Sequence, residues 1–491
     1  MNTSAIPDAA AHPRRWAILA LLSIAQLMVV LDATVVNIAL PSAQHALHFS
    51  DGSRQWIVTA YALAFGSLLL LGGRIGDLFG RKWTFVAGLI GFAVASAIGG
   101  SAPSFEVLVA ARAAQGAFGA LLAPAALSLL TTTFPTGQDR AKAFGIFGAI
   151  AGGGGAVGLI LGGVLTEYLS WRWSMYVNLL FAVPAVIGAI SLIAHAPHPV
   201  RPRIDMPGVL TASGGLFAVV YGLAHADTTS WGNPVTVGFL AVGVLLLAAF
   251  ATIQRRVAHP LLPLRVVLDR RRGGSYAAFA IAAAGMFGVF LFLTYYLQQT
   301  LGYTPVRTGL AFLPMIGVLM VTATLATARL APRYGSRPLV PTGMLLAALG
   351  MLILTRLGLH STYLGGVLPA LLPLGLGLGL IFAPSMSAAT AGVSSGDAGV
   401  ASAMVNTSQQ VGGAVGTALL NTLFASSIAG YLGTHGTGSL AQASAAVHGY
   451  GTAFGWAAAI FVAGAILTGL ILPSGAQKSV PEVDSELVFA H

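Results

Sequence analysis

Two charged residues, Asp32 and Arg112, stand inside long apolar stretches of the sequence. An ionised Asp at the centre of a membrane helix costs about 2.5 to 3.5 kcal/mol on insertion scales, so it requires a partner or a water-filled cavity. Each of the two residues lies about six positions from one end of its stretch, a depth of about 9 Å at the helical rise. The sequence therefore predicts that they can pair. Two uses of the pair remain open: a locking ion pair, or a carboxylate that binds and releases a proton.

The composition of the chain is that of a membrane protein. Of its 491 residues, 56% are hydrophobic and 8% are charged, against roughly 25% charged in a soluble domain. The absence of cysteine excludes disulfides, iron-sulfur clusters and thiolate zinc sites. The net charge of +10 is divided among short segments, so it indicates topology and attraction to the lipid bilayer, and we expect no nucleic-acid partner.

Side chains suited to catalysis are scarce. We expect Glu106, Glu167 and Asp227, near the outer ends of apolar stretches, to be solvated, and the 11 His residues lack metal-ligand spacing. The string GLGLGL (375–380) looks like a fragment of a dinucleotide fingerprint, but no strand precedes it, so it predicts a helix packing face. We therefore expect neither an enzyme nor a metal or cofactor site.

Fourteen apolar stretches are long enough to cross a bilayer, which takes about 20 residues. With the N-terminus in the cytoplasm, 19 of the 24 Lys and Arg residues fall on the inner side, as the positive-inside rule expects. Both termini are then cytoplasmic, Arg54 lies at an outer span end, and residues 431–451 form an outer loop. The predicted spans are 16–39, 54–73, 83–101, 106–131, 142–166, 173–194, 207–225, 235–254, 275–299, 308–328, 338–356, 364–389, 404–430 and 452–473.

An internal repeat divides the chain into two halves. GRIGDLFGRK (73–82), after span 2, aligns with ARLAPRYGSR (328–337), after span 10, with Gly80 over Gly335 and Lys82 over Arg337. Two repeated six-span halves are a transporter plan with a binding site at the midplane. The predicted all-α organisation comprises an N-terminal tail (1–15), a six-helix bundle (16–194), a linker with two additional spans (195–274), a second six-helix bundle (275–473) and a C-terminal tail (474–491).

Six motifs resemble those of the major facilitator superfamily, and specifically its fourteen-span drug:proton antiporter branch. The resemblance implies the major facilitator fold and proton-driven export. It also implies that a loop with Gly73, Asp77, Gly80, Arg81 and Lys82 holds a cytoplasmic gate closed. The motifs, which run in the family's order, are LDATVVNIALP (31–41), GRIGDLFGRK (73–82), RAAQGAFG (112–119), WRWSMYVN (171–178), YLQQTLGYTP (296–305) and NTSQQVGGAVG (406–416).

The fifth span departs from the family's antiporter pattern. Leu159 stands where the resemblance implies a proline, so a proline kink is absent there. The span instead carries Gly154, Gly158 and Gly162 at four-residue spacing, followed by Gly163. This spacing allows helices to approach closely, whereas glycine also weakens a helix. A packing face and a flexible element for alternating access both remain open.

Neutral polar and aromatic side chains are the candidates for a central cavity. Singly, each could equally bond to a neighbouring helix. Together they predict an apolar, aromatic pocket with few fixed polar contacts, which suits a large lipophilic substrate. The candidates are Thr34, Asn37, Tyr61, Gln115, Tyr295, Gln298, Asn406 and Gln409.

The sequence thus predicts a secondary exporter in the inner membrane of a bacterium, acting as a monomer. It would exchange protons, coupled at Asp32 and Arg112, for a lipophilic compound that can be cationic, with the proton gradient as energy source. A dedicated exporter of one metabolite made by the same cell remains an alternative. A non-transporting membrane sensor is another, although it would need a soluble output domain, and the longest polar tail is the segment after Leu472.

Overall fold

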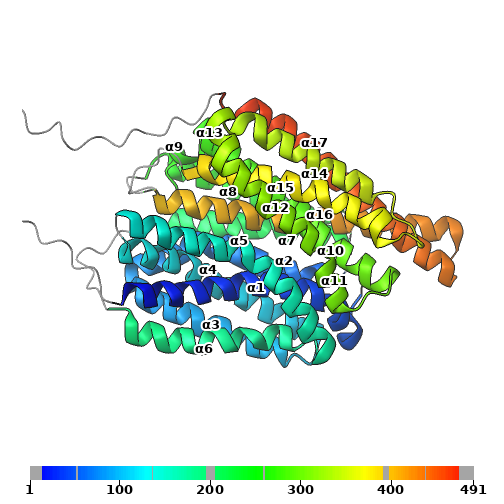
Figure 1. The fold of residues 1–491 in the computed structure, drawn as a ribbon, viewed down its shortest axis with the longest axis horizontal. Coiled ribbons are helices and arrows are strands. Elements are labelled where there is room, and N and C mark those ends of the chain that lie inside the picture. The colour runs from blue at the N-terminus through cyan, green and yellow to red at the C-terminus, as the bar shows by residue number, and fades with distance from the viewer. Residues whose placement is uncertain are drawn as a thin grey trace, which may run out of the picture.

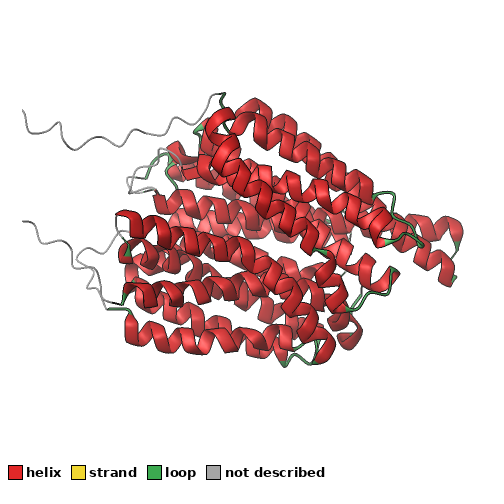
Figure 2. Ribbon diagram, in the orientation of Figure 1, coloured by secondary structure: helices red, strands yellow, loops and turns green. Residues whose placement is uncertain are grey.

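The computed structural model describes residues 14–50, 53–134, 137–194, 205–229, 231–257, 260–390, 398–436 and 438–474. Within these ranges the chain is helical, with short loops and no strand (Figure 2). The helices are α1 (Arg15–Leu47), α2 (Gln55–Phe79), α3 (Arg81–Gly100), α4 (Phe105–Thr133), α5 (Gly137–Tyr168), α6 (Trp173–Leu192), α7 (Met206–Thr228), α8 (Pro234–Gln254), α9 (Leu264–Val267), α10 (Arg270–Tyr295), α11 (Pro305–Ala311), α12 (Leu313–Leu325), α13 (Ala331–Tyr334), α14 (Ser336–Leu354), α15 (Leu368–Thr390), α16 (Ala398–His435) and α17 (Ser439–Ile471), with π-helical turns at Tyr296–Thr300, Ala326–Leu330 and Tyr363–Val367.

Local side chains set where several helices begin. Asp205, Asn233, Asp269 and Thr304 each accept a hydrogen bond from a backbone N–H two or three positions further on. Such a cap satisfies a first-turn donor that has no partner within the helix. Helices α7, α8, α10 and α11 therefore begin directly after these residues.

Helices α1 to α6 pack into a first bundle, the blue to cyan-green lower part of Figure 1. Lipid provides no hydrophobic drive between helices, so close contact depends on small residues. A Cβ at Gly72 on α2 would overlap the Ala120 carbonyl of α4, and one at Gly116 on α4 would overlap the Tyr61 carbonyl of α2. The backbones of α2 and α4 therefore touch at two levels.

A second bundle contains α10 to α17, the upper part of Figure 1. Gly412 of α16 lies against the backbone of α10 in the same way. The GLGLGL string confirms its predicted role as a packing face, because Gly375 and Gly379 contact α12 and Gly377 contacts α14. In the second bundle too, glycine allows neighbouring backbones to meet.

The sequence repeat corresponds to a structural one. Gly80 lies between α2 and α3 with φ of 93°, and Gly335 lies between α13 and α14 with φ of 75°. A positive φ is accessible to glycine at little cost. The two aligned glycines thus make the same sharp break at the same place in each half.

The aligned basic residues, Lys82 and Arg337, form what we call the end clamps. Lys82 Nζ donates hydrogen bonds at 2.6 and 2.8 Å to two carbonyl oxygens at the end of α6. Arg337 Nε donates to the Gly469 carbonyl near the end of α17, at 3.1 Å. A cation is favoured at a helix C-terminus, where carbonyls lack partners. Each clamp joins the third helix of its half to the sixth.

Helices α7 and α8 pack on each other, and α7 contacts both α2 of the first bundle and α16 of the second. Ser213 on α7 donates a hydrogen bond to the Ser67 carbonyl of α2 at 2.5 Å. On α8, Val242, Val244 and Leu245 are exposed, as expected of a helix that faces lipid. Helix α7 therefore lies against both bundles, and α8 packs on α7 at the periphery.

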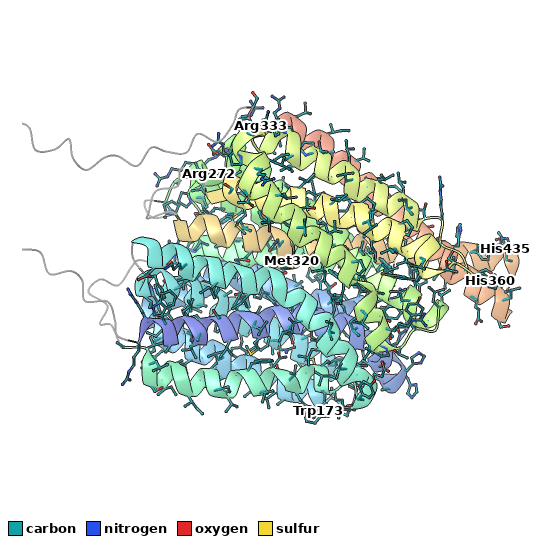
Figure 3. The ribbon with its side chains drawn as sticks, viewed as in Figure 1. Trp173, Arg272, Met320, Arg333, His360 and His435 are labelled. Carbon is teal, nitrogen blue, oxygen red and sulfur yellow. The ribbon has the colours of Figure 1, made fainter. Side chains whose placement is uncertain are left out.

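Residues 431–451 do not form the predicted outer loop. Helix α16 continues to His435 and α17 begins at Ser439, so the segment is a helical hairpin. The 38 residues of α16 span about 57 Å, which exceeds a hydrocarbon core of about 30 Å. His435 accordingly lies at the extremity of the molecule opposite Arg272 and Arg333 (Figure 3).

Fourteen long helical segments occur in the described ranges, counting α11 with α12 as one. Twelve segments are long and apolar enough to cross a membrane, while α2 and α5 have shorter apolar parts, Gln55–Leu69 and Val157–Tyr168. The predicted plan of two six-helix bundles with two inserted helices is confirmed.

Single cysteines at Leu268 and Leu440 should react from opposite sides of the membrane. Both side chains are well exposed, at 69% and 72%, and the chain has no other thiol. Leu268 adjoins the basic cluster Arg270 to Arg272, which marks an inner end. In intact cells an impermeant maleimide should label Leu440→Cys at once and Leu268→Cys only after permeabilisation. Equal labelling of both before permeabilisation would contradict the predicted orientation.

Candidate functional site

Asp32 lies on α1, fully buried within the first bundle. Its Oδ2 accepts a hydrogen bond from Arg112 Nη1 of α4 at 2.5 Å. Its Oδ1 accepts hydrogen bonds from Gln115 Nε2 at 2.9 Å and from Asn178 Nδ2 of α6 at 2.8 Å. The buried carboxylate thus has a counter-charge and donors on both oxygens, which offset its loss of water.

Arg112 is 2% exposed and is bound on several sides. Its Nη1 also donates to Gln115 Oε1 at 2.8 Å, and its Nε donates to the Ile57 carbonyl of α2 at 3.2 Å. The guanidinium lies over the ring of Tyr61, with Cζ 4.4 Å from the ring centre. Cation–π attraction is strongest where water is excluded. The guanidinium is therefore held in one place by α1, α2 and α4 together.

Gln115 extends the network to α3. Its Nε2 donates to Ser96 Oγ at 2.7 Å, and Ser96 Oγ in turn donates to the Phe92 carbonyl at 2.7 Å. The network, which we call the carboxylate cluster, comprises Asp32, Tyr61, Ser96, Arg112, Gln115 and Asn178. All its members belong to the first bundle. It can hold one buried charge pair or, with Asp32 protonated, a neutral acid beside an arginine.

The contact between Asp32 and Arg112 confirms that their matched depth allows pairing. Two members of the cluster, Ser96 and Asn178, were not predicted. Asn178 had a signal, because it ends the motif WRWSMYVN and is an amide inside an apolar stretch. Ser96 had none, since it is one small residue among the glycines and alanines of α3.

Three glycines of α5 face α1. A Cβ at Gly154 would press on Val30, one at Gly158 would overlap Thr34 Oγ1, and one at Gly162 would press on the backbone of Val35. Gly163 points elsewhere, to the backbone of Val306 on α11. Leu159, at the position of the missing proline, is buried, and its carbonyl lies against Gly309 of α11. The stripe is therefore a packing face toward α1.

Residues 73–82, predicted as a gate loop, are the last part of α2, Gly80 and the first residues of α3. Gly80 supplies the break between the helices, Lys82 binds the end of α6, and Gly73 makes ordinary contact with Pro124 of α4. Arg81 is partly buried, and the side chain of Asp77 lies outside the described part of the structure. Arg74, on the same part of α2, donates to the Pro260 carbonyl at 3.4 Å, which ties this end of α2 to the segment after α8.

The eight candidate cavity residues have different surroundings in this structure, and their role in a substrate pocket stays a prediction. Hydroxyl and amide groups find local partners because a bond to their own helix or a neighbour is always within reach. Thr34 and Asn37 donate to carbonyls of their own helix, Tyr61 and Gln115 belong to the carboxylate cluster, Tyr295 is buried in an aromatic group, Gln298 donates to the Ile38 carbonyl, Gln409 is partly buried, and Asn406 is exposed.

The two bundles meet at the end of the molecule that carries Trp173 and His360 (Figure 3). Asn421 of α16 donates to Gln55 of α2 at 3.0 Å, with both side chains buried. Glu167 of α5 accepts a hydrogen bond from the Val306 N–H at the start of α11, at 3.0 Å. Glu167 is exposed, as predicted, and it also caps a helix of the other half.

Glu106, Asp227 and Arg54 were also predicted near outer span ends. Glu106 is exposed, as expected, and the side chain of Asp227 lies outside the described residues. Arg54 was predicted at an outer span end, but its side chain is fully buried among aromatic rings of the second bundle. No pattern in the sequence indicated that this cation is enclosed.

The fold and the carboxylate cluster define a polytopic membrane protein of two repeated bundles, the class to which secondary transporters belong. The family model for the Major Facilitator Superfamily matches residues 22–417. The chain belongs to this family of transporters, as the six motifs predicted.

Known proteins resemble the chain over almost its whole length. It is 50% identical over 480 residues to the puromycin resistance protein of Streptomyces alboniger, covering 96% of this chain and 95% of that one. It is 39% identical over 464 residues to the cephamycin export protein of Amycolatopsis lactamdurans, covering 94% and 93%. A solved bacterial homologue of the human lysosomal transporter Spinster, inward-facing and unoccupied, has the same fold, with a TM-score of 0.65, 16% identity, and 94% and 97% coverage.

Removing one member of the buried pair should destabilise the protein more than removing both. Breaking a buried ion pair costs about 3 to 5 kcal/mol because a charge is left uncompensated, whereas replacing both partners can be nearly neutral. Arg112→Met alone should therefore lower the melting temperature strongly, and adding Asp32→Asn should restore most of it. Tryptophan fluorescence of the purified variants in detergent measures this. A double variant less stable than Arg112→Met would show that the charges do not compensate each other.

Proposed function

We propose that the chain is a secondary exporter that exchanges protons for lipophilic compounds, antibiotics among them, and that Asp32 binds the coupled proton. The observation that carries the proposal is the carboxylate cluster, a buried acid paired to a buried arginine inside a transporter fold. Buried ionisable groups within membrane spans mark ion and proton pathways. The names of the relatives, a puromycin resistance protein and a cephamycin export protein, support the class of substrate.

The hydrogen bonds of Asp32 explain how binding a proton would change the contact between α1 and α4. In the ionised form, the charge of the carboxylate is balanced by Arg112 and shared with two amides. When a proton adds to a carboxylate oxygen, the charge that holds Arg112 is lost, and the charge-assisted bond becomes a weaker one. Protonation therefore loosens the link between α1 and α4, and deprotonation restores it. A cationic substrate in place of the proton would act in the same direction.

The position of the cluster determines how the proton binds. All its members lie in the first bundle and Asp32 is not exposed, so a relative movement of the two bundles alone would not open it. Proton uptake therefore requires α1 to shift against α4 within the first bundle. The glycine stripe of α5 gives α1 a surface with few side chains to lock it. The stripe thus serves as packing face and as sliding surface in this mechanism.

The two bundles provide alternating access. Gln55, Glu167 and Gln298 each bind a residue of the other half at the end we assign to the outside. We propose that these contacts close the outer end, that the loop from Gly73 to Lys82 forms the inner gate, and that both termini lie in the cytoplasm. The location is the inner membrane of a bacterium, and the functional unit is a single chain, since each half supplies the other's partner.

A dedicated exporter of a single metabolite is the second candidate, and the relatives named for one compound each favour it. Drug susceptibility separates the two. The chain is expressed in a pump-deficient host and a panel of antibiotics is tested with and without an uncoupler. Protection against several chemical classes that the uncoupler removes supports a broad exporter, and protection against one compound supports a dedicated one.

Substrate-induced proton release should disappear in Asp32→Asn. The amide cannot take up a proton, although it is similar in size and retains hydrogen bonding in the cluster. Asp32→Glu should retain part of the release. Glu106→Gln, which removes an exposed acid near the outer end, is the matched control and should release protons as the parent does. The measurement is the pH change of weakly buffered, purified protein on addition of a transported compound. Undiminished release from Asp32→Asn would assign the coupling to another group.

A further inference from the structure

Arg54, directly before α2, inserts its guanidinium into a group of aromatic rings. Its Cζ lies 4.0 Å from the ring centre of Tyr295, 4.7 Å from that of Phe424 and 5.8 Å from that of Phe292. All four side chains are at most 2% exposed. A cation within about 6 Å of a ring face is attracted by the ring's quadrupole. The three rings, which we call the aromatic cage, thus form a site already shaped for a positive charge.

The cage belongs wholly to the second bundle. Tyr295 and Phe292 come from α10, and Phe424 comes from α16. Phe424 packs on Phe292 at 5.3 Å and on Tyr450 of α17 at 5.1 Å between ring centres. Because α10 and α16 are in backbone contact at Gly412, the rings are held together by their own bundle. The cage therefore does not depend on Arg54 for its shape.

The cation in the cage comes from the other half of the molecule. Arg54 and the neighbouring Gln55, which binds Asn421 of α16, lie at the outer meeting point of the bundles. When the outer end opens, α2 and α16 must separate there, and the guanidinium leaves while the rings stay behind. The opening would expose three aromatic faces at the outer mouth.

We propose that the aromatic cage, vacated by Arg54, binds organic cations in the outward-open state. Arg54 is then an internal substitute for the ligand: its return displaces the bound cation and closes the outer end. The chemical class is an ammonium, quaternary ammonium or similar delocalised cation, the groups that aromatic cages recognise. This inference rests on the proposed alternating access, but not on Asp32 as the proton site.

Thiol chemistry at position 54 tests the cage directly. The chain has no cysteine, so Arg54→Cys carries one thiol beside the rings. Its rate of modification from outside is measured with a cationic reagent, a trimethylammonium methanethiosulfonate, and with the anionic sulfonate analogue. The ratio of the two rates is compared with the same ratio for Leu440→Cys, an exposed control. We expect the cationic reagent to be favoured by about fivefold over the control ratio. Adding Phe424→Leu, which leaves all charges unchanged, should remove most of that preference.

The outcomes separate this inference from the proposed function. If Phe424→Leu leaves the ratio of cationic to sulfonate modification rates unchanged, the cage is not a cation site. The same conclusion follows if cells with Arg54→Cys export drug but the thiol reacts with neither reagent. If Arg54→Cys does not reach the membrane, efflux of ethidium and of the uncharged dye Nile red is compared in Phe424→Leu and Phe424→Tyr, with Arg54 retained. Selective loss of ethidium efflux in Phe424→Leu supports the cage, and equal loss of both dyes refutes it. Absence of any efflux in the parent would instead refute the exporter.

Discussion

The ion pair between Asp32 and Arg112 constrains the first bundle more than any other contact. Leaving a buried charge without its partner costs about 3 to 5 kcal/mol, so every helix that supplies a partner is fixed in register. Arg112 requires the Ile57 carbonyl and the ring of Tyr61, while Asp32 requires the amides of Gln115 and Asn178. Helix α3 joins the network because its Ser96 hydroxyl accepts a hydrogen bond from Gln115. One carboxylate on α1 and its counter-ion therefore position α2, α3, α4 and α6.

Glycine allows the other close contacts between helices to form. In α2, α4, α5, α15 and α16 it lies where a side chain would strike a neighbouring helix backbone. Such contacts give dense packing without polar groups, and they hold the helices of each bundle together. The contacts between bundles add to such glycine contacts, which join α5 to α11, single hydrogen bonds at Gln55, Glu167 and Gln298 and the cation of Arg54.

The sequence predicted two kinds of feature. One follows from the free-energy cost of a charged side chain in the membrane, and the other follows from the internal repeat. The cost of a charge in lipid singled out Asp32 and Arg112, and the alignment of Gly80 with Gly335 located the same turn twice. It could not predict features that depend on which helices face each other. Distance from a span end correctly predicted that Glu167 is exposed, but it could not predict that Glu167 and Arg54 contact the other half.

The cavity residues stay a prediction for the same reason. Polarity within a span is visible in the sequence, but Thr34 and Asn37 bind their own helix, and Gln115 serves the ion pair. The helical hairpin at 431–451 was missed because its residues are too polar to be counted as a span, although they extend two helices. The span count was unaffected by that error, since hydropathy alone sets it.

The end clamps have a consequence for how such a protein diversifies. Lys82 and Arg337 each bind a helix end within their own half, so neither half needs the other to keep its third and sixth helices together. Substitutions on the surfaces where the halves face each other can therefore accumulate without loosening either half. A lineage built on this arrangement can acquire a new cargo by altering those surfaces while its folding remains unchanged.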